Sequence, residues 1–337
     1  MKKWLIDGQK KQYKANLHCH SIYSDGKLSP KQLKEEYKKQ GYSVLAITDH
    51  EHLVEHHQLT DEGFLMLTGY EMFVFSLPCD HNENSTSHLC LYSKTPNNKM
   101  LYYSPEEVYS RYVVREGKTI EYHKIKETRE HTVEFVRNAI KDAISAGFLV
   151  SHCHPTWSFE GEDFSDAFEN CFAMEIYNHG SYNSGYFEYN QHFYECQIKK
   201  GYRIGLLAVD DNHNFYSIGH SQNDSFGGAT YIIAEQLDYD SIIRALEKQD
   251  FYASTGPLIY ALEVENGLIK VRTSAAERIC FMTNTRNRGI KIASIGETVY
   301  DAEFQLGETD KWVRVEVVDG EGKRAFSRAF FRNELDE

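Results

Sequence analysis

The first two thirds of the chain alternate short apolar runs with segments that have helical spacing. Ser29–Pro30 is typical of a helix start, and Gly41 is typical of a helix end, so we predict a helix over about 30–40. A helical stripe over 132–146 has apolar side chains at 133, 135, 136, 139, 140, 143 and 144. Further helices are predicted at 186–200 and 239–248, with a helix start at 104–107.

Apolar runs between these helices predict strands at 14–17, 42–47, 64–67, 87–92, 148–150, 173–177, 203–209 and 227–233. Strands that alternate with helices indicate a mostly parallel sheet. Six or more such units favour a closed barrel over an open sheet, and the working residues of such barrels lie at the carboxyl ends of the strands.

After about residue 257 the pattern changes to alternating apolar and polar positions, as in 262–271 and 312–318. Asn266–Gly267 and Asp319–Gly322 are typical hairpin turns. We therefore predict two domains. Residues 1–256 form the α/β barrel, with an excursion at 94–130, and residues 257–337 form a small all-β, sandwich-like domain.

Polar pairs follow the apolar runs at His18-Cys19-His20, His152-Cys153-His154 and Asp211-Asn212-His213. Residues i and i+2 of a strand point to the same face, so each pair can aim two ligands at one point. His50 closes the run 44–50, and Glu71 follows 64–67. The pattern favours a metal site over a set of satisfied core histidines, because cations would neutralise such a crowd.

Composition narrows the possible partners. The net charge of −13 disfavours duplex nucleic acid and leaves a small anionic substrate possible. No run of about 18 apolar residues exists, and Asp7 interrupts the start of any signal peptide, so we expect a cytoplasmic protein without a membrane span. Seven scattered cysteines without a C-x-x-C pair argue against a disulfide framework; Cys19 and Cys153 should face a core layer.

The motifs, taken together and in order, resemble the PHP family, named for polymerase and histidinol phosphatase. They are Asn16-Leu17-His18-Cys19-His20-Ser21, Ser24-Asp25-Gly26, Ile47-Thr48-Asp49-His50, Gly69-Tyr70-Glu71, His88, His154-Pro155, Met174-Glu175-Ile176-Tyr177-Asn178 and Asp211-Asn212-His213. The resemblance covers roughly 14–256 and implies a distorted (β/α)7 barrel with two or three divalent metal ions. By resemblance the ligands are His18, His20, Asp25, His50, Glu71, His88, His154, Asp211 and His213.

Two ligand assignments keep alternatives. His152 could replace or assist His154, although the His154–Pro155 pair favours 154, and Asp210 could compete with Asp211, although D-x-H spacing favours 211. Asp49 is expected either to orient a ligand imidazole or to cap a helix.

The resemblance also implies a phosphoesterase that hydrolyses a small phosphate ester. Imidazole and carboxylate ligands suit Zn, Mn or Fe, and two ions can share a bridging hydroxide that attacks phosphorus. Glu71 is expected to bridge the ions, and His88, His213 or His179 to assist the leaving group. The alternatives are an exonuclease acting on oligonucleotides, or a metal-binding regulatory barrel without turnover. The oligomeric state is not indicated by the sequence.

Overall fold

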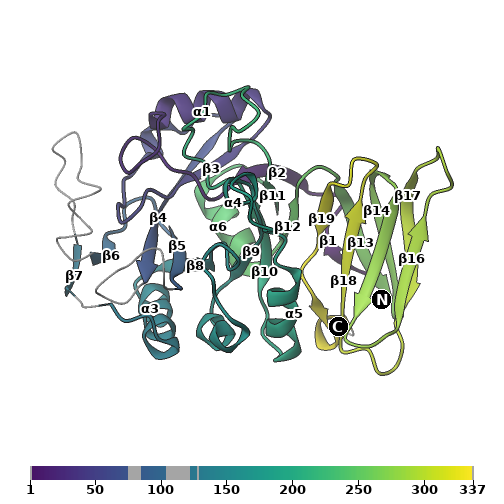
Figure 1. Cartoon of the computed structure of the whole chain (residues 1–337). Helices are drawn as coiled ribbons and strands as arrows, with labels where there is room; N and C mark the ends of the chain where they lie inside the picture. Colours follow the sequence, from purple (N-terminus) through teal and green to yellow (C-terminus); the bar gives the residue numbers. More distant parts are fainter. Residues whose placement is uncertain (1, 75–84, 104–121, 127–128, 336–337) are drawn as a thin grey trace.

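A computed structural model describes residues 2–74, 85–103, 122–126 and 129–335. An α/β region is followed by a β-rich C-terminal region (Figure 1). The α/β region is built on seven neighbouring strands in the order β10-β9-β8-β5-β4-β3-β2. Their bounds are β2 (Lys11–Asn16), β3 (Val44–Ile47), β4 (Leu65–Val74), β5 (Ser87–Ser93), β8 (Phe148–His152), β9 (Ala173–Asn178) and β10 (Gly205–Val209).

Six of these strands run in one direction, and β5 runs against its neighbours β4 and β8. The amino end of β5 therefore lies beside the carboxyl ends of the other six strands. We call this edge of the α/β region the carboxyl end. β11 (Ala229–Ala234) and β12 (Phe251–Ser254) continue the sheet beyond β2.

The two ends of the seven-strand series approach each other without a regular ladder between β10 and β11, both of which are fully described. The Thr230 hydroxyl on β11 hydrogen-bonds Ala208 on β10. Just beyond the strands, the Asp211 N–H donates to the His18 carbonyl at 2.9 Å, and the His20 N–H donates to the Asn212 carbonyl at 3.0 Å. These bonds join the segments after β2 and β10, while a closed barrel remains a prediction.

Helices pack on the outside of this sheet. Ser29 caps α1 in a capping box with Gln32, as the sequence predicts, and Thr132 caps α3. Between the helices and strands lie apolar clusters that include Cys19 and Cys153, also as predicted. The helices are α1 (Pro30–Lys39), α3 (Val133–Ser145), α4 (His179–Asn183), α5 (Gln191–Lys199) and α6 (Tyr239–Lys248), with 3-10 turns η1 (His57–Leu59) and η2 (Glu162–Phe168).

The C-terminal region contains two sheets around an apolar core of its own. The β12–β19 pair makes the second sheet continuous with the α/β sheet, and β1 pairs with β13. The first sheet is β1 (Lys2–Ile6), β13 (Ile259–Glu265), β14 (Leu268–Ala276) and β17 (Val299–Gln305). The second is β19 (Arg324–Phe326), β18 (Trp312–Val318), β15 (Arg278–Thr283), β16 (Arg288–Ile292) and β20 (Phe330–Phe331), with α7 (Arg332–Leu335) after it.

Several predictions about elements need correction. β4 continues to Val74, so Glu71 lies inside a strand and not after one. The helix predicted at 186–200 is shorter, as α5, and a separate short helix α4 precedes it. β1, β16 and β17 have no counterpart among the predicted strands, and the division at residue 256 stays a prediction because β1 joins the C-terminal sheet.

The predicted excursion at 94–130 contributes β6 (Met100–Tyr103) and β7 (Tyr122–Lys126), which pair in parallel. The predicted helix start at 104–107 lies outside the described residues. In the parts of the chain that the structure describes, no helix has the length and apolar character needed to span a bilayer.

Candidate metal centre

Glu71 lies at the middle of a cluster of imidazoles at the carboxyl end. Its side chain is fully buried, and the two carboxylate oxygens face different histidines. Oε1 lies 2.7 Å from His88 Nδ1 and 3.3 Å from His154 Nε2. Oε2 lies 2.6 Å from His50 Nδ1 and 3.4 Å from the Nε2 atoms of both His18 and His20. One carboxylate therefore faces five imidazole rings.

The remaining predicted ligands extend the cluster toward solvent. Asp211 Oδ1 lies 2.9 Å from His20 Nε2 and 3.2 Å from His18 Nε2. Asp25 Oδ1 lies 3.4 Å from His213 Nε2 and 3.7 Å from His50 Nε2. All nine predicted ligands thus converge. Eight of them form overlapping groups: Glu71 with His18 and His154, Asp211 with His18 and His20, and Asp25 with His20, His50 and His213. His88 joins the cluster through its contact with Glu71.

Among the described residues of the cluster, Asp25 and His213 are the most exposed. The side chain of Asp25 is 34% exposed and that of His213 is 19% exposed, whereas His18, His20 and Glu71 are completely covered. A small solute could therefore reach the groups from the side of Asp25 and His213.

Backbone direction explains how these side chains meet. His18 and His20 follow β2, and His50 follows β3, at the carboxyl ends of parallel strands. His88 is the second residue of β5, in agreement with the strand predicted at 87–92, whereas Glu71 lies inside β4. The antiparallel direction of β5 brings this amino end to the same edge of the sheet.

Opposite charges set the protonation of the cluster. Burial raises the pKa of Glu71, but the imidazoles of His50, His18 and His88 outweigh it and lower that pKa well below its usual value. Burial together with the neighbouring His50 and His213 lowers the pKa of His20 to about 3. Burial also lowers the pKa of His154, but Glu71 and Asp211 raise it to about 9. The fold therefore holds ionised carboxylates against imidazoles of mixed protonation.

The donor set fits divalent cations. Within the described residues, Glu71 Oε2 makes no well-directed hydrogen bond, although three imidazole nitrogens lie within 3.4 Å of it. A buried carboxylate oxygen in this state is costly unless a cation offsets its charge. Oxygen and imidazole nitrogen ligands without thiolate suit borderline transition metals.

The structure separates both pairs of alternatives. His152 contacts the Glu160 carboxylate and stacks on Phe168 with 3.5 Å between ring centroids, so it lies outside the cluster. Same-face spacing fails here because the chain leaves β8 at His152, and His154 turns with a φ of 23°. His154, not His152, reaches Glu71.

Asp210 is likewise occupied elsewhere. Its carboxylate accepts hydrogen bonds from the Tyr37 hydroxyl at 2.6 Å and from the N–H groups of residues 226, 227 and 228 at 2.7–2.9 Å. Gly228 allows this approach, since a Cβ there would lie 2.4 Å from the Val209 carbonyl oxygen. Asp211 is thus the residue that faces the histidines.

Asp49 approaches a ligand imidazole only through a serine, because the Ser24 hydroxyl that it binds lies 3.5 Å from His20 Nδ1. It accepts hydrogen bonds from Ser21 at 2.6–2.7 Å and from the Ser24 hydroxyl at 2.7 Å, and no described helix begins after it. It therefore organises the turn that leads to Asp25. His179, a candidate for assisting the leaving group, has its ring nitrogens next to the Tyr177 hydroxyl at 2.8 Å and the Asn183 amide at 3.3 Å.

Two buried polar residues near the cluster were not singled out from the sequence. Glu175 on β9 is fully buried and contacts His18, and Glu51 pairs with the buried Arg129 beside His50. A charged residue in the buried run Ala173–Asn178 was a usable signal for Glu175, because such residues are rarely buried without a partner. No local pattern links Glu51 to Arg129, since 78 residues separate them.

Comparisons with known proteins fit the geometry. The family model of the PHP domain matches residues 16–252, which is more than half of the chain. The chain belongs to the PHP family. Within this PHP protein the match includes all nine clustered residues. No curated protein matches the chain.

Solved structures provide weaker likenesses. A two-domain protein containing a predicted PHP-like metal-dependent phosphoesterase from Bacteroides vulgatus has 14% identity and a TM-score of 0.46, with 96% of each chain covered. A putative metal-dependent phosphoesterase from Bifidobacterium adolescentis has 16% identity and a TM-score of 0.43, with 64% of this chain and 93% of the other covered. An amidohydrolase from Chromobacterium violaceum with bound sulfate has 15% identity and a TM-score of 0.38, covering 59% of this chain and 87% of the other.

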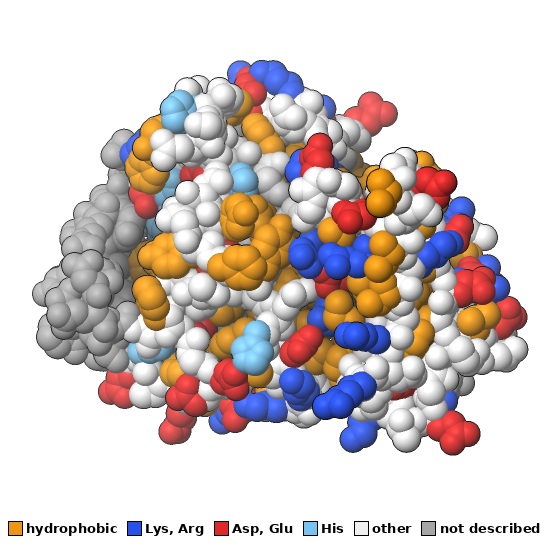
Figure 2. Space-filling view, turned by 45° about the vertical axis from the view of Figure 1, so that its right-hand side comes forward, with side chains coloured by type: hydrophobic (Ala, Val, Ile, Leu, Met, Phe, Trp, Pro, Cys, Tyr) orange, Lys and Arg blue, Asp and Glu red, His pale blue; other side chains and the backbone are white. Residues whose placement is uncertain are grey.

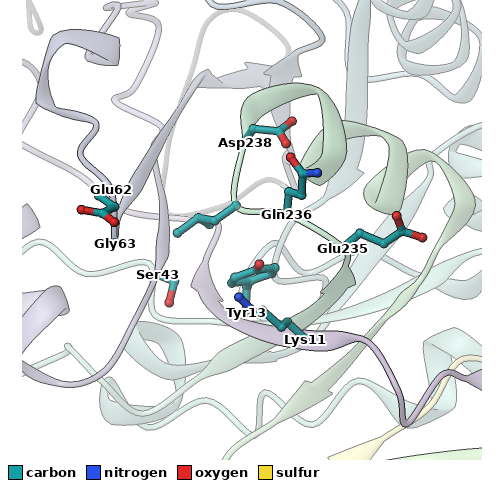
Figure 3. A pocket seen from close by; sticks show the side chains of 9 residues that line it. Lys11, Tyr13, Ser43, Glu62, Gly63, Glu235, Gln236 and Asp238 are labelled. Atoms are coloured by element: carbon teal, nitrogen blue, oxygen red, sulfur yellow. The ribbon is translucent and has the colours of Figure 1, made fainter.

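A second hollow lies at the opposite, amino end of the strands, with a volume of about 520 Å³ (Figure 3). It is lined by Lys11, Tyr13, Ser43, Glu62, Gly63, Glu235, Gln236, Leu237 and Asp238. The acidic charge of the chain is unevenly spread: Figure 2 shows Lys and Arg side chains gathered beside hydrophobic side chains on part of one face.

Proposed function

We propose that this PHP protein is a metal-dependent phosphoesterase that hydrolyses a small phosphate ester. The observation that carries the proposal is the convergence of eight imidazole and carboxylate side chains around Glu71, whose Oε2 makes no well-directed hydrogen bond in the described part of the chain. Two or three divalent ions would be held by His18, His20, Asp25, His50, Glu71, His88, His154, Asp211 and His213.

Divalent ions held there would lower the pKa of water and offset the negative charge of the phosphate. The chain's own residues orient the substrate and manage protons. Because Asp25 and His213 form the accessible edge, we place the approach of the phosphate there. The scissile P–O bond breaks as water supplies the new oxygen on phosphorus, and the leaving oxygen takes up a proton.

An imidazole at the edge of the cluster is the proposed source of that proton. His213 and His88 are the candidates, and His213 is favoured, because its side chain is 19% exposed at the accessible edge whereas that of His88 is 10% exposed. His179 is not favoured, because both of its ring nitrogens are engaged by Tyr177 and Asn183.

The test is hydrolysis of p-nitrophenyl phosphate by metal-depleted protein to which Mn²⁺ or Zn²⁺ is added back. The wild type should turn over, and His18→Ala should lose about 100-fold or more, because a ligand is removed. His152→Ala is the matched control, since it removes a buried imidazole that lies outside the cluster, and it should keep most of the activity.

The same assay separates the alternatives. Bis(p-nitrophenyl) phosphate hydrolysis that exceeds monoester hydrolysis would favour the exonuclease or phosphodiesterase alternative. Absence of turnover with every metal, in protein that binds metal, would overturn the enzyme and favour a regulatory metal-binding protein.

A further inference from the structure

A buried carboxylate on β9 touches several candidate ligands without belonging to the ligand set. Glu175 Oε1 lies 2.7 Å from His18 Nδ1, the ring nitrogen that faces away from Glu71. Glu175 Oε2 accepts the backbone N–H of His154 and the side-chain amide of Asn178, each at 2.9 Å. The Asn178 amide also donates to Asp211 Oδ2 at 3.1 Å.

Two side chains from a single strand therefore reach three ligand residues that come from three other segments. Glu175 and Asn178 are both fully buried, so their polar atoms depend on these contacts for compensation. Within the nine-residue cluster, His154 with a φ of 23° and Asp211 with a φ of 51° have left-handed backbones. Such conformations cost free energy in residues other than glycine and persist only when neighbours hold them. Both of these residues are held by Glu175 or Asn178.

We propose that Glu175 and Asn178 are positioning residues that tie His18, His154 and Asp211 into one geometry and so set the affinity of the metal centre. This inference rests on the metal centre of the proposed function. By accepting a hydrogen bond from Nδ1–H, Glu175 keeps the proton on the outer nitrogen of His18, which leaves the Nε2 lone pair free for a cation. The bond to the His154 N–H and the link to Asp211 fix where the other two ligands stand.

The same neighbourhood offers a competing arrangement. Glu175 and His18 also lie with Cys90 and Cys153 in a group whose ligand atoms are within 4.8 Å of one another. A deeper ion held by these thiols would make Glu175 a ligand. The observed contacts favour positioning, because both oxygens of Glu175 already receive N–H donors.

The experiment measures Mn²⁺ binding to metal-depleted full-length protein by titration calorimetry. Glu175→Gln keeps size and removes charge, and it should raise the dissociation constant about 10- to 100-fold. Asn178→Ser should raise it about 10-fold, since serine keeps an oxygen to cap α4 but loses the amide donor.

Glu160→Gln is the matched control. Glu160 is a covered carboxylate that also pairs with a histidine, His152, but neither residue belongs to the cluster. The affinity of the Glu160→Gln variant for Mn²⁺ should equal that of the wild type. At saturating Mn²⁺ the hydrolysis rate of Glu175→Gln should largely recover, because the defect is one of occupancy; general structural damage would not be rescued.

Three results would overturn the inference: unchanged Mn²⁺ affinity in Glu175→Gln, an equal loss in Glu160→Gln, or a thiolate-to-cobalt absorption band on Co²⁺ loading that disappears in Cys90→Ser. If Glu175→Gln does not fold, Asn178→Ser provides the same comparison. Because binding is measured without substrate, a wild type that binds Mn²⁺ but hydrolyses no ester would contradict the proposed function and leave this inference intact.

Discussion

The two ends of the α/β region both gather acidic side chains but place them in opposite environments. At the carboxyl end Glu71 is fully buried among imidazoles, and at the amino end Glu235 is 75% exposed and 3.5 Å from Lys10. Glu62 and Asp238 line the same hollow as Glu235 (Figure 3). Water can screen charges at the amino end, whereas at the carboxyl end only neighbouring groups or bound cations can do so.

Residue type alone does not make a metal centre. The carboxylates of the amino end come from loops that leave them in solvent, where a cation gains little by replacing water. At the carboxyl end the strands bring the ligands together before any ion arrives, so the cost of ordering them is met by folding.

The largest expected effect is that of Glu71→Gln. The amide keeps the shape but removes the charge that faces five imidazoles, so bound metal and hydrolysis should each fall about 100-fold or more. Metal content by atomic emission and turnover of p-nitrophenyl phosphate check this. Wild-type metal content in the variant would contradict the difference between the two ends, because the buried charge of Glu71 would then not be needed to bind the cation.

The second effect is a pH dependence confined to the carboxyl end. In the metal-free protein, burial lowers the pKa values of His154 and His213, but neighbouring carboxylates outweigh it. Glu71 raises the pKa of His154 to about 9, and Asp25 raises that of His213 to about 9. Below pH 9 these rings hold protons that a cation must displace. Metal affinity should therefore rise from pH 6 to pH 9, about tenfold per pH unit for each proton displaced.

Calorimetry at pH 7.5 in buffers of different ionisation enthalpy should detect proton release on metal binding, and the release should diminish above pH 9. A flat affinity between pH 6 and pH 9 would contradict this assignment of protons.

The third effect separates two adjacent acids at the same end. Asp210→Asn should destabilise the metal-free protein by about 1–3 kcal/mol, because the new amide meets hydroxyl and N–H donors where the carboxylate accepted four hydrogen bonds. Urea denaturation measures the loss. Metal affinity should change less than in Asp211→Asn, and the reverse order would show that Asp210 is the ligand.

The smallest effect is expected at the amino end. Glu235→Gln and Glu62→Gln should change the free energy of unfolding by no more than about 0.5 kcal/mol, because exposed charges contribute little to stability. Metal content should be unchanged. Loss of bound metal in either variant would show that the second hollow also holds an ion.

Much of the α/β region could be predicted from local pattern. Ser29–Pro30, Thr132 and the stripe of α3 mark helix starts by chemistry that acts within a few residues. The direction of β5 could not be predicted, because strand periodicity is the same for parallel and antiparallel neighbours. That direction is what places His88 beside Glu71.

Ligands could be predicted from i, i+2 spacing where the backbone stays extended, but not where the chain turns. His18 and His20 both reach Glu71, but the identical spacing at His152 and His154 brings in only one ring, because the chain turns after β8. His56 was expected to be a solvated loop residue, and this is wrong, because the residue is buried, with 3% of its surface exposed. A charge inside a buried strand marks Glu175 as unusual, but its contact with His18 joins residues 157 positions apart and could not be predicted from a local pattern.

The pairing of β1 with β13 and of β12 with β19 has a consequence for how the chain is made. Among the described strands, β1 has no partner until β13, Ile259–Glu265, has been synthesised. A chain cut near residue 256 would leave β12 with a bare edge and β1 without a sheet, and bare edges recruit other chains. Shortened versions that keep every metal-facing residue are therefore expected to aggregate. The C-terminal region thus protects the edge of β12 and pairs with β1.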